Sequence, residues 1–315
     1  MTALSLRVDR IDALTPQIRR LVLRTTDGSA LPAYAPGAHV ELHVPGPRPL
    51  RRAYSLVTPC DGGDRIEIAV QLEAEGSGGS RWVHGLAEGE VIDASAPKNL
   101  FPLIDAAESH LLLAGGIGIT PILCMARALA AAGQRYALHY AARERDRAAY
   151  CAEVEALEHA RCWFDGGDPA RGMPLAEVIG APAAGRHLYV CGPKGFIAAV
   201  LDTGRRLGWA DANLHCELFT GALDEAGDRP FTVELATSGI TLDVPVGKTV
   251  MDVMEDAGLD PMFDCRRGEC GLCTARVLDG EADHRDICLS ARERAEGGFC
   301  TCVSRARSAR LVLEL

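Results

Sequence analysis

Residues 110–123, HLLLAGGIGITPIL, place three glycines between an apolar run and a segment of helical periodicity. This order predicts a strand, a tight turn and a helix of an α/β fold. Gly115, Gly116 and Gly118 have no side chains, so the backbone at this turn can approach a ligand closely. Because the N–H groups at a helix start have no partners within the helix, the turn is a candidate seat for a pyrophosphate.

The turn departs from the ordinary dinucleotide fingerprint G-x-G-x-x-G, because Pro121 stands where the third glycine would be. We expect Pro121 to occupy the first helical position and Thr120 to cap the helix. Taken alone, the segment is equally compatible with a turn that binds nothing. A second turn, Cys191-Gly192-Pro193, ends a later apolar run. Two such turns at one sheet edge would form a ligand-binding crevice.

Downstream of residue 110, short apolar runs alternate with helical patterns, which predicts a parallel, doubly wound sheet. The expected strands are 111–114, 136–141, 161–164, 187–190 and 214–219, and the expected helices are 121–132, 148–159, 175–179 and 195–207. Upstream, period-2 alternation with frequent turn residues predicts a small antiparallel barrel. Its expected strands are 4–12, 18–25, 39–44, 51–57, 65–73 and 91–95, with one helix over 80–86.

A third unit follows the polar segment DEAGDRP, and its pattern predicts a hairpin, an acidic helix and closing strands around a cysteine-rich loop. The expected multidomain organisation is a β-barrel over 1–105, an α/β domain over 106–222, a linker over 223–230 and an α+β domain over 231–315.

Composition limits the classes of partner. The 33 basic residues against 43 acidic ones give a net charge of −10, which opposes binding to nucleic acid or to an anionic membrane surface. The longest uncharged apolar stretch, 111–126, is too short to span a bilayer. Charged residues interrupt the N-terminus where a signal peptide would be apolar, so we expect a cytoplasmic, reducing location.

Six of the twelve cysteines fall within the last 51 residues of the chain. Cys265-x4-Cys270-x2-Cys273, followed at a distance by Cys302, is the plant-type spacing for a [2Fe-2S] cluster. Two iron ions bridged by two sulfides need four thiolates around one compact core, and a tight loop with one distant cysteine supplies them. Zinc is the weaker alternative, because zinc sites usually show paired C-x2-C knuckles or added histidines.

Spacing alone does not decide which cysteine is the fourth cluster ligand, because Cys300 lies two residues before Cys302 and could take its place. Cys288 is equally without an assigned role. Isolated cysteines elsewhere, such as Cys151 and Cys162, are by default small core residues.

Upstream, Arg52 and Tyr54 are expected to share one face of a strand, with Leu56 continuing that face. An arginine can grip a phosphate and a tyrosine can lie against an aromatic ring system. Residues 76–80, GSGGS, open the helix of the barrel and form a second candidate phosphate seat. For either segment alone, a solvated strand edge or a flexible loop is the simpler interpretation.

With these segments in order, the chain resembles the phthalate dioxygenase reductase family, which includes vanillate O-demethylase reductases, within the ferredoxin-NADP reductase superfamily. The resemblance covers essentially the whole chain. It rests on R-A-Y-S-L at 52–56, G-G-I-G-I-T-P at 115–121, V-C-G-P at 190–193 and the cysteines from 265 to 302.

The resemblance implies FMN, NADH and a C-terminal β-grasp ferredoxin with a [2Fe-2S] cluster. The closing Cys302-Val-Ser-Arg-Ala matches the family's last-ligand segment, which favours Cys302. Ser77 stands where the family commonly has an arginine, which removes one charge from the expected phosphate pocket. The implied cofactor contacts are Arg52, Tyr54, Ser55, Leu56, Gly78, Gly79, Ser80, Gly115, Gly116, Gly118, Thr120, Pro121, Cys191, Gly192, Pro193 and Phe219; the implied cluster ligands are Cys265, Cys270, Cys273 and Cys302.

The expected function is therefore the reductase component of a Rieske-type oxygenase that acts on aromatic rings or methoxy groups. No acid or base is needed for hydride transfer, so no catalytic residue is named; Ser55 and Glu217 would either tune the flavin or be an ordinary strand hydroxyl and a solvated carboxylate. The alternatives are an iron-sulfur carrier or sensor without nicotinamide oxidation, or a reductase for a non-Rieske acceptor. Five acids, at 252, 255, 256, 260 and 264, would form either a docking surface or a solvated helix face.

Overall fold

The computed structural model describes residues 3–46, 50–73, 78–219, 227–263, 266–268 and 270–315. The chain divides into two compact units, residues 1–217 and 218–315, and each is described by itself. In the part of the chain that the structure describes, no helix combines the length and apolarity needed to cross a membrane.

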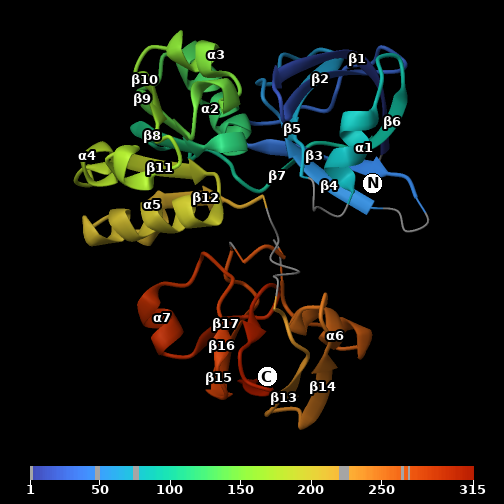
Figure 1. The fold of residues 1–315 in the computed structure, drawn as a ribbon, viewed down its shortest axis with the longest axis vertical. Helices are drawn as coiled ribbons and strands as arrows, with labels where there is room; N and C mark the ends of the chain where they lie inside the picture. Colours follow the sequence, from blue (N-terminus) through green and yellow to red (C-terminus); the bar gives the residue numbers. More distant parts are fainter. Residues whose placement is uncertain (1–2, 47–49, 74–77, 220–226, 264–265, 269) are drawn as a thin grey trace. The chain divides into compact units, whose positions relative to one another are not determined.

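The first unit begins with an antiparallel sheet of the order β4-β3-β6-β1-β2-β5, with β7 beside β3 (Figure 1). An isolated bridge between Leu56 and Ile68 joins its two ends, which confirms the predicted barrel. Alternate strand residues such as Leu21 and Leu23 are fully buried inside it. Its elements are β1 (Ala3–Thr15), β2 (Ile18–Thr25), β3 (Ala38–Val44), β4 (Leu50–Ser55), β5 (Arg65–Gln71), α1 (Gly79–Gly85), β6 (Val91–Ser95) and β7 (Lys98–Asn99).

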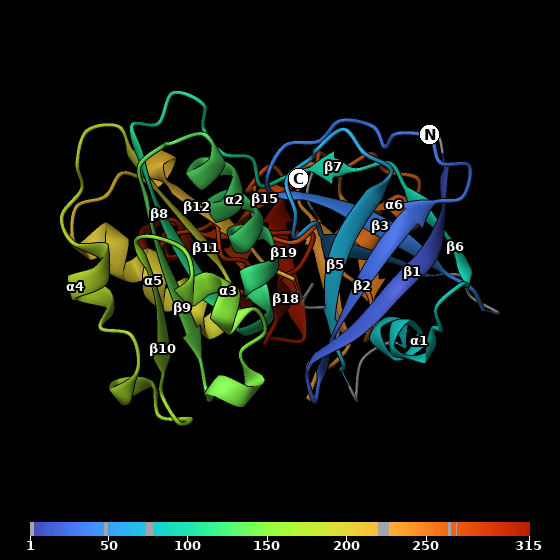
Figure 2. The ribbon, with the colours of Figure 1, turned by 90° about the horizontal axis from the view of Figure 1, so that it is seen from above.

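The same unit continues with a five-stranded parallel sheet of the order β10-β9-β8-β11-β12. Helices α2 and α3 pack on one face and α4 and α5 lie on the other, as predicted for a doubly wound sheet (Figure 2). The elements are β8 (Ser109–Gly115), α2 (Ile119–Ala131), β9 (Tyr136–Ala142), α3 (Cys151–Glu155), β10 (Ala160–Phe164), α4 (Leu175–Ile179), β11 (Arg186–Cys191), α5 (Lys194–Arg206) and β12 (Leu214–Glu217).

The helix expected over 148–159 is wrong in length, since α3 spans only five residues. Tyr150 adopts a left-handed backbone with φ of 60° directly before α3, and its hydroxyl donates to Glu67 of the barrel at 3.0 Å. His159, with φ of 59°, is also left-handed. Tertiary contacts therefore override the helical periodicity of this segment.

The described part of the second unit has a mixed sheet of the order β14-β13-β19-β15-β17 and a separate β16-β18 pair; α6 packs in its apolar core. Thr249 begins α6 with a capping box, in which its hydroxyl accepts from the Asp252 N–H and the Asp252 carboxylate accepts from the Thr249 N–H. The elements are β13 (Phe231–Leu235), β14 (Ile240–Val244), α6 (Val250–Asp256), β15 (Thr274–Asp279), β16 (Ala282–Asp283), α7 (Ala291–Ala295), β17 (Gly298–Cys300), β18 (Arg305–Ala306) and β19 (Arg310–Glu314).

Candidate functional site

The order of the parallel sheet places a topological switch point between β8 and β11. From β8 the chain proceeds outward through β9 to β10, and from β11 it proceeds in the other direction to β12. Ligands of open α/β sheets bind at the carboxyl ends of the strands where the strand order reverses. Both predicted glycine turns, after β8 and after β11, lie at this point.

The two turns approach so closely that only glycine fits. A Cβ on Gly118 would lie 2.4 Å from the carbonyl carbon and oxygen of Cys191. A Cβ on Gly192 would lie 3.0 Å from the Cα of Gly115. The 2.4 Å distance at Gly118 is far shorter than a van der Waals contact. The atoms it would meet belong to the Cys191 backbone, which cannot move aside as a flexible side chain could. Gly118 and Gly192 therefore allow the two strand ends to lie close together. Gly116 is different: its φ of 54° lies in the left-handed region, which glycine adopts without strain.

Thr120 and Pro121 do not have the predicted roles at the helix start. The N-cap of α2 is Gly118 without a side-chain cap, and Pro121 is the third helical residue. The Thr120 hydroxyl donates to the Ile117 carbonyl at 3.1 Å, and the side chain is buried. Pro121 is tolerated because the first four N–H groups of a helix have no intrahelical partner.

In the barrel, β4 carries the expected alternation. Arg52 and Tyr54 are half-buried, whereas the neighbouring Arg51 and Ala53 are exposed. A Cβ on Gly79 would lie 2.7 Å from Cγ of Arg52, so the missing side chain makes room for the arginine at the start of α1. Burial raises the pKa of Tyr54 to about 12, so its ring is a neutral, partly buried surface.

Two other predicted residues of the barrel have local roles. The Ser80 hydroxyl accepts from the Glu73 N–H at 3.0 Å, and Leu56 is fully buried in the barrel core. Gly78 has φ of 101° at the N-cap of α1, where a residue with a side chain would be strained. Ser77 lies outside the described residues.

The barrel and the parallel sheet meet at the end of β4. The Ser55 hydroxyl donates to Oε2 of Glu217 at 3.4 Å, although 162 positions separate the two residues. Glu217 is 1% exposed at the carboxyl end of β12, where it pairs in register with Cys191. Its burial excludes the solvated carboxylate considered from sequence, and the bond joins the flavin-type strand to the edge that carries the glycine turns.

Phe219 belongs to the second unit and is 39% exposed. Its expected place near the flavin stays a prediction.

The cysteine cluster is brought together within the second unit. Sγ of Cys273 lies 3.2 Å from Sγ of Cys302, and both residues are buried. Cys270 is exposed on the loop, and Cys265 lies outside the described residues. Adjacent cysteine sulfurs are the donors that an iron-sulfur core requires, so the pair Cys273 and Cys302 fits the cluster.

Gly268 and Gly271 both adopt φ of 72° in this loop, and a Cβ on Gly268 would lie 2.8 Å from the Asp286 Cα. The Cys300 sulfur lies 3.4 Å from that of Cys288 and also hydrogen-bonds to Cys273. The pKa of Cys273 is lowered to about 2, chiefly by hydrogen bonds from Cys300 and then Cys302, and that of Cys300 is raised. Thiolate character at Cys273 suits a metal ligand.

The predicted acidic surface is largely neutralised. Arg266 forms an ion pair with Glu255 and lies 3.9 Å from Asp252, and Lys248 pairs with Asp256. Asp264 lies outside the described residues. These pairs favour a solvated, self-compensated helix face over a docking surface of uniform charge.

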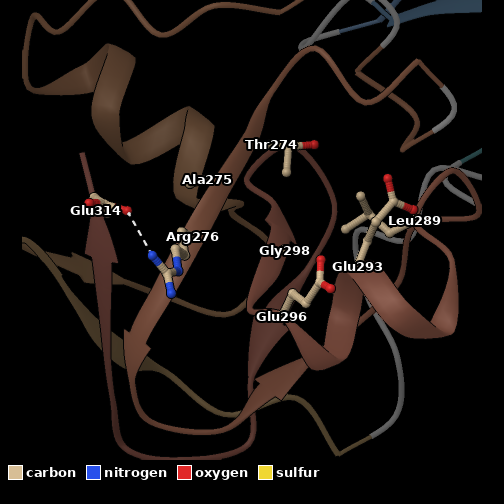
Figure 3. Close-up of a pocket in the computed structure, with 8 residues that line it drawn as sticks. All are labelled: Thr274, Ala275, Arg276, Leu289, Glu293, Glu296, Gly298 and Glu314. Atoms are coloured by element: carbon tan, nitrogen blue, oxygen red, sulfur yellow. Dashed lines mark ion pairs between the residues drawn. The ribbon is translucent and has the colours of Figure 1, made fainter.

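A hollow of about 500 Å³ lies beside β15, β17 and α7 in the second unit (Figure 3). Its carboxylates already have partners: Glu314 lies 4.0 Å from Arg276, Glu296 pairs with Arg292, and Glu293 caps α7. None of its eight lining residues is a predicted site residue.

Comparison with known proteins gives the second unit a cofactor. Residues 233–307 match the model of the 2Fe-2S iron-sulfur cluster binding domain, so this unit is a ferredoxin domain with a [2Fe-2S] cluster. Residues 92–214 match the dimethylamine monooxygenase subunit DmmA-like N-terminal domain.

Three relatives extend the likeness over the whole chain. Vanillate O-demethylase oxidoreductase of Pseudomonas sp. is 45% identical over 295 residues, covering 92% of each chain. The heme-dependent oxidative N-demethylase beta subunit of Ectopseudomonas mendocina is 37% identical, covering 100% of this chain and 99% of its own. The solved structure of phthalate dioxygenase reductase, titled for electron transfer from pyridine nucleotides to [2Fe-2S], is 35% identical, with a TM-score of 0.72 and coverage of 99% and 98%.

A barrel, a parallel sheet with a glycine-lined switch point and a [2Fe-2S] domain define an NAD(P)H-dependent flavin iron-sulfur reductase. The chain belongs to the phthalate dioxygenase reductase and vanillate O-demethylase reductase family, which confirms the resemblance seen in the sequence. Members of this family are the reductase components of oxygenase and demethylase systems, and the carrier without nicotinamide oxidation is thereby set aside.

Proposed function

We propose that this chain oxidises NADH, holds FMN in its barrel and passes electrons through the [2Fe-2S] cluster to a Rieske-type oxygenase. The observation that carries the proposal is the hydrogen bond from Ser55 to Glu217, which joins the end of β4 to the switch point of the parallel sheet. Bound FMN would supply the chemistry that accepts a hydride and releases electrons singly.

The chain's own residues would bind and orient the flavin, the dinucleotide and the cluster. Arg52, beside the backbone of Gly79, offers a positive charge to the flavin phosphate. Tyr54 offers a flat neutral ring on the same face of β4. The turn at Gly116, where a Cβ would meet no atom within 4 Å, leaves open backbone for the dinucleotide. Cys265, Cys270, Cys273 and Cys302 would hold the cluster.

The residues after β9 favour NADH over NADPH. Both terminal nitrogens of Arg145 bind Glu155, at 2.9 and 2.6 Å, and Arg147 lies 3.5 Å from Glu144. Glu155 and Glu144 are thus already paired with the guanidinium groups that a 2′-phosphate would need. Their negative charges would also repel that phosphate.

The test uses the purified holoprotein. Released flavin is identified by mass spectrometry, and flavin bleaching is followed anaerobically with each nucleotide. We expect FMN, and kcat/KM for NADH at least about tenfold above that for NADPH, which corresponds to about 1.4 kcal/mol. FAD in the holoprotein, or no bleaching by NADH, would contradict the proposal.

The acceptor is tested by reconstitution. A Rieske oxygenase is the proposed partner, acting on an aromatic acid or methoxy-aromatic, whereas the 37% identity to a heme-dependent N-demethylase subunit favours a heme acceptor as the second candidate. Turnover with the oxygenase encoded beside this chain distinguishes them, because the metal centre of that partner is directly measurable. We also propose a cytoplasmic location, which suits a chain with twelve cysteines and a thiolate-held cluster.

A further inference from the structure

Two cysteines far from the cluster lie side by side in the parallel-sheet domain. Cys151 is the first residue of α3 and Cys162 is the third residue of β10, and their sulfurs are 3.5 Å apart. Cys162 is half-buried and Cys151 is 7% exposed. A separation of 3.5 Å leaves only a small movement to bond formation, since a disulfide bond measures about 2.05 Å.

A guanidinium group lies against this pair. Nη1 of Arg145 donates to Sγ of Cys151 at 3.4 Å, and the planar group lies over the ring of Phe164, 5.2 Å from its centroid. Glu155 holds Arg145 in place through two hydrogen bonds of 2.9 and 2.6 Å. A positively charged donor beside a sulfur is the setting in which protein thiols react as thiolates.

The two thiols are not equivalent. Burial, and then the neighbouring Cys151, raise the pKa of Cys162 to about 12, so Cys162 keeps its proton. Arg145 donates a hydrogen bond to the sulfur of Cys151, so negative charge that develops during a reaction is stabilised on that sulfur. The position of the guanidinium thus favours Cys151 as the attacking sulfur, with Cys162 beside it as the second thiol.

The same group of residues is poorly suited to a metal ion. The sulfurs of Cys151 and Cys162 and a carboxylate oxygen of Glu155 lie within 4.8 Å of one another. Both oxygens of Glu155 are already bound by Arg145, however, and the guanidinium would repel a cation. Redox chemistry therefore fits the arrangement better than coordination.

We propose that Cys151 and Cys162 are a peroxide-oxidised thiol pair that closes reversibly to a disulfide. The sulfur of Cys151 attacks one oxygen of hydrogen peroxide and the thiol gives up its proton. The O–O bond breaks, and the leaving hydroxide takes up that proton as the first water, which leaves a sulfenic acid at Cys151. Sγ of Cys162 then attacks that sulfur and loses its proton, and the sulfenic hydroxyl leaves as the second water. Overall, two thiols are oxidised and one peroxide is reduced to two waters.

The source of peroxide inside the cell depends on the proposed function, because a reduced flavin that meets dioxygen can release hydrogen peroxide. The test supplies hydrogen peroxide from outside. Its result is therefore independent of which flavin or acceptor the protein uses.

Trypsin separates the two cysteines, because Arg147, Arg161 and Arg171 bound two peptides, 148–161 and 162–171. The holoprotein is treated with a small excess of hydrogen peroxide, its remaining thiols are alkylated after unfolding, and the digest is analysed by mass spectrometry. We expect the two peptides to appear joined, with the loss of two hydrogens, and to separate after dithiothreitol. Cys124, which is fully buried, is the internal control and should remain alkylated.

Substitutions test the role of Arg145. Arg145→Met should slow formation of the joined peptide several-fold, whereas Arg135→Met, which removes a 76% exposed guanidinium at another edge, should not. In Cys162→Ser, oxidation should stop at a sulfenic acid on Cys151 that dimedone traps. Three results would each overturn the proposal. Both cysteines could remain fully alkylated after peroxide; the two peptides could join no faster than either joins to Cys60 or Cys216; or a stoichiometric amount of zinc could protect the pair from oxidation.

Discussion

The Ser55 hydroxyl donates to Oε2 of Glu217 across 162 positions of sequence, and the accepting carboxylate is 1% exposed. This bond links the last residue of a barrel strand to the last residue of a strand of the parallel sheet. The sheet residue beside Glu217 in register is Cys191, which begins the second glycine turn. This buried contact, together with that of Tyr150 with Glu67, joins the two halves of the first unit, and it lies where both predicted cofactor segments end.

Replacing Ser55 by alanine removes a donor to a buried carboxylate. We expect Ser55→Ala to lower the free energy of unfolding by about 1–3 kcal/mol, because the carboxylate loses one of its hydrogen bonds without access to water. Ser29→Ala is the matched control, since Ser29 makes the same hydroxyl-to-carboxylate bond to Asp27 at an exposed site. Denaturant unfolding of both variants makes the comparison; equal losses would contradict the importance of burial.

Gly118→Ala should damage the switch point. Its new Cβ would lie 2.4 Å from the Cys191 backbone, so the two turns must separate, at a cost of about 1–3 kcal/mol and with weaker dinucleotide binding. Gly195→Ala, in the first turn of α5, meets no atom within 4 Å and should be neutral or slightly stabilising. Melting temperature and KM for NADH are the measurements, and an unchanged KM in Gly118→Ala would argue against the proposed crevice.

The choice of fourth cluster ligand is tested by two serine variants. Cys302→Ser should lose most of the iron and the visible absorbance of the cluster, because its sulfur lies 3.2 Å from that of Cys273. Cys300→Ser should keep both, although Cys300 also hydrogen-bonds to Cys273, because the segment that begins at Cys302 matches the family's last-ligand segment. Iron analysis of the purified variants decides the point, and the reverse result would make Cys300 the ligand.

A buried ion cluster anchors the start of the ferredoxin domain. Asp228 binds Arg285, with Nη1 at 3.1 Å, and lies 3.6 Å from Nε of Arg305; all three side chains are at most 5% exposed. Asp228→Asn should cost about 3 kcal/mol, because Arg305 loses its buried carboxylate partner and Arg285, which keeps Asp283, loses one of its own. Asp279→Asn, whose side chain is 72% exposed beside Arg310, should cost less than about 1 kcal/mol. Thermal unfolding followed by loss of cluster absorbance measures both, and similar losses would contradict the argument.

The first unit should lose stability in mild acid. Burial lowers the pKa of His187 and His110, and lowers that of His215 from 6.5 to about 4 with added repulsion from those two histidines. The unfolded chain thus binds more protons than the folded one between about pH 4 and 6.5, so stability is complete above that range and falls as the pH falls through it.

His215→Gln should flatten this dependence. Nδ1 of His187 and Nε2 of His215 share a hydrogen bond of 2.9 Å, which one neutral ring must donate to the other. His43→Gln, on a barrel strand, is the control. Melting temperatures from about pH 7 to about pH 5 are compared, and an equal slope in wild type and His215→Gln would remove the explanation.

Local sequence patterns predict an element correctly where the face that the pattern makes apolar is also the face that the fold buries. The strand at 18–25 and the helix at 175–179 have the predicted bounds. The helix expected over 148–159 is reduced to Cys151–Glu155 because the buried Tyr150 takes a left-handed backbone to reach Glu67, a residue 83 positions away. Asp228 lay in a predicted linker, yet it is buried in the second unit by arginines that follow it by 57 and 77 positions.

By itself, the sequence determined the three kinds of element pattern, the two glycine turns and the spacing of the cluster cysteines, because each depends on residues close together in the chain. Only the tertiary structure decided that the Cys191 backbone leaves no room for a side chain at Gly118. It also decided that Glu217 is buried against Ser55 and that Arg145 hydrogen-bonds to both Cys151 and Glu155. The physical reason is that short-range periodicity and backbone preference are encoded locally. Desolvation and contact between distant side chains are set by how whole sheets pack.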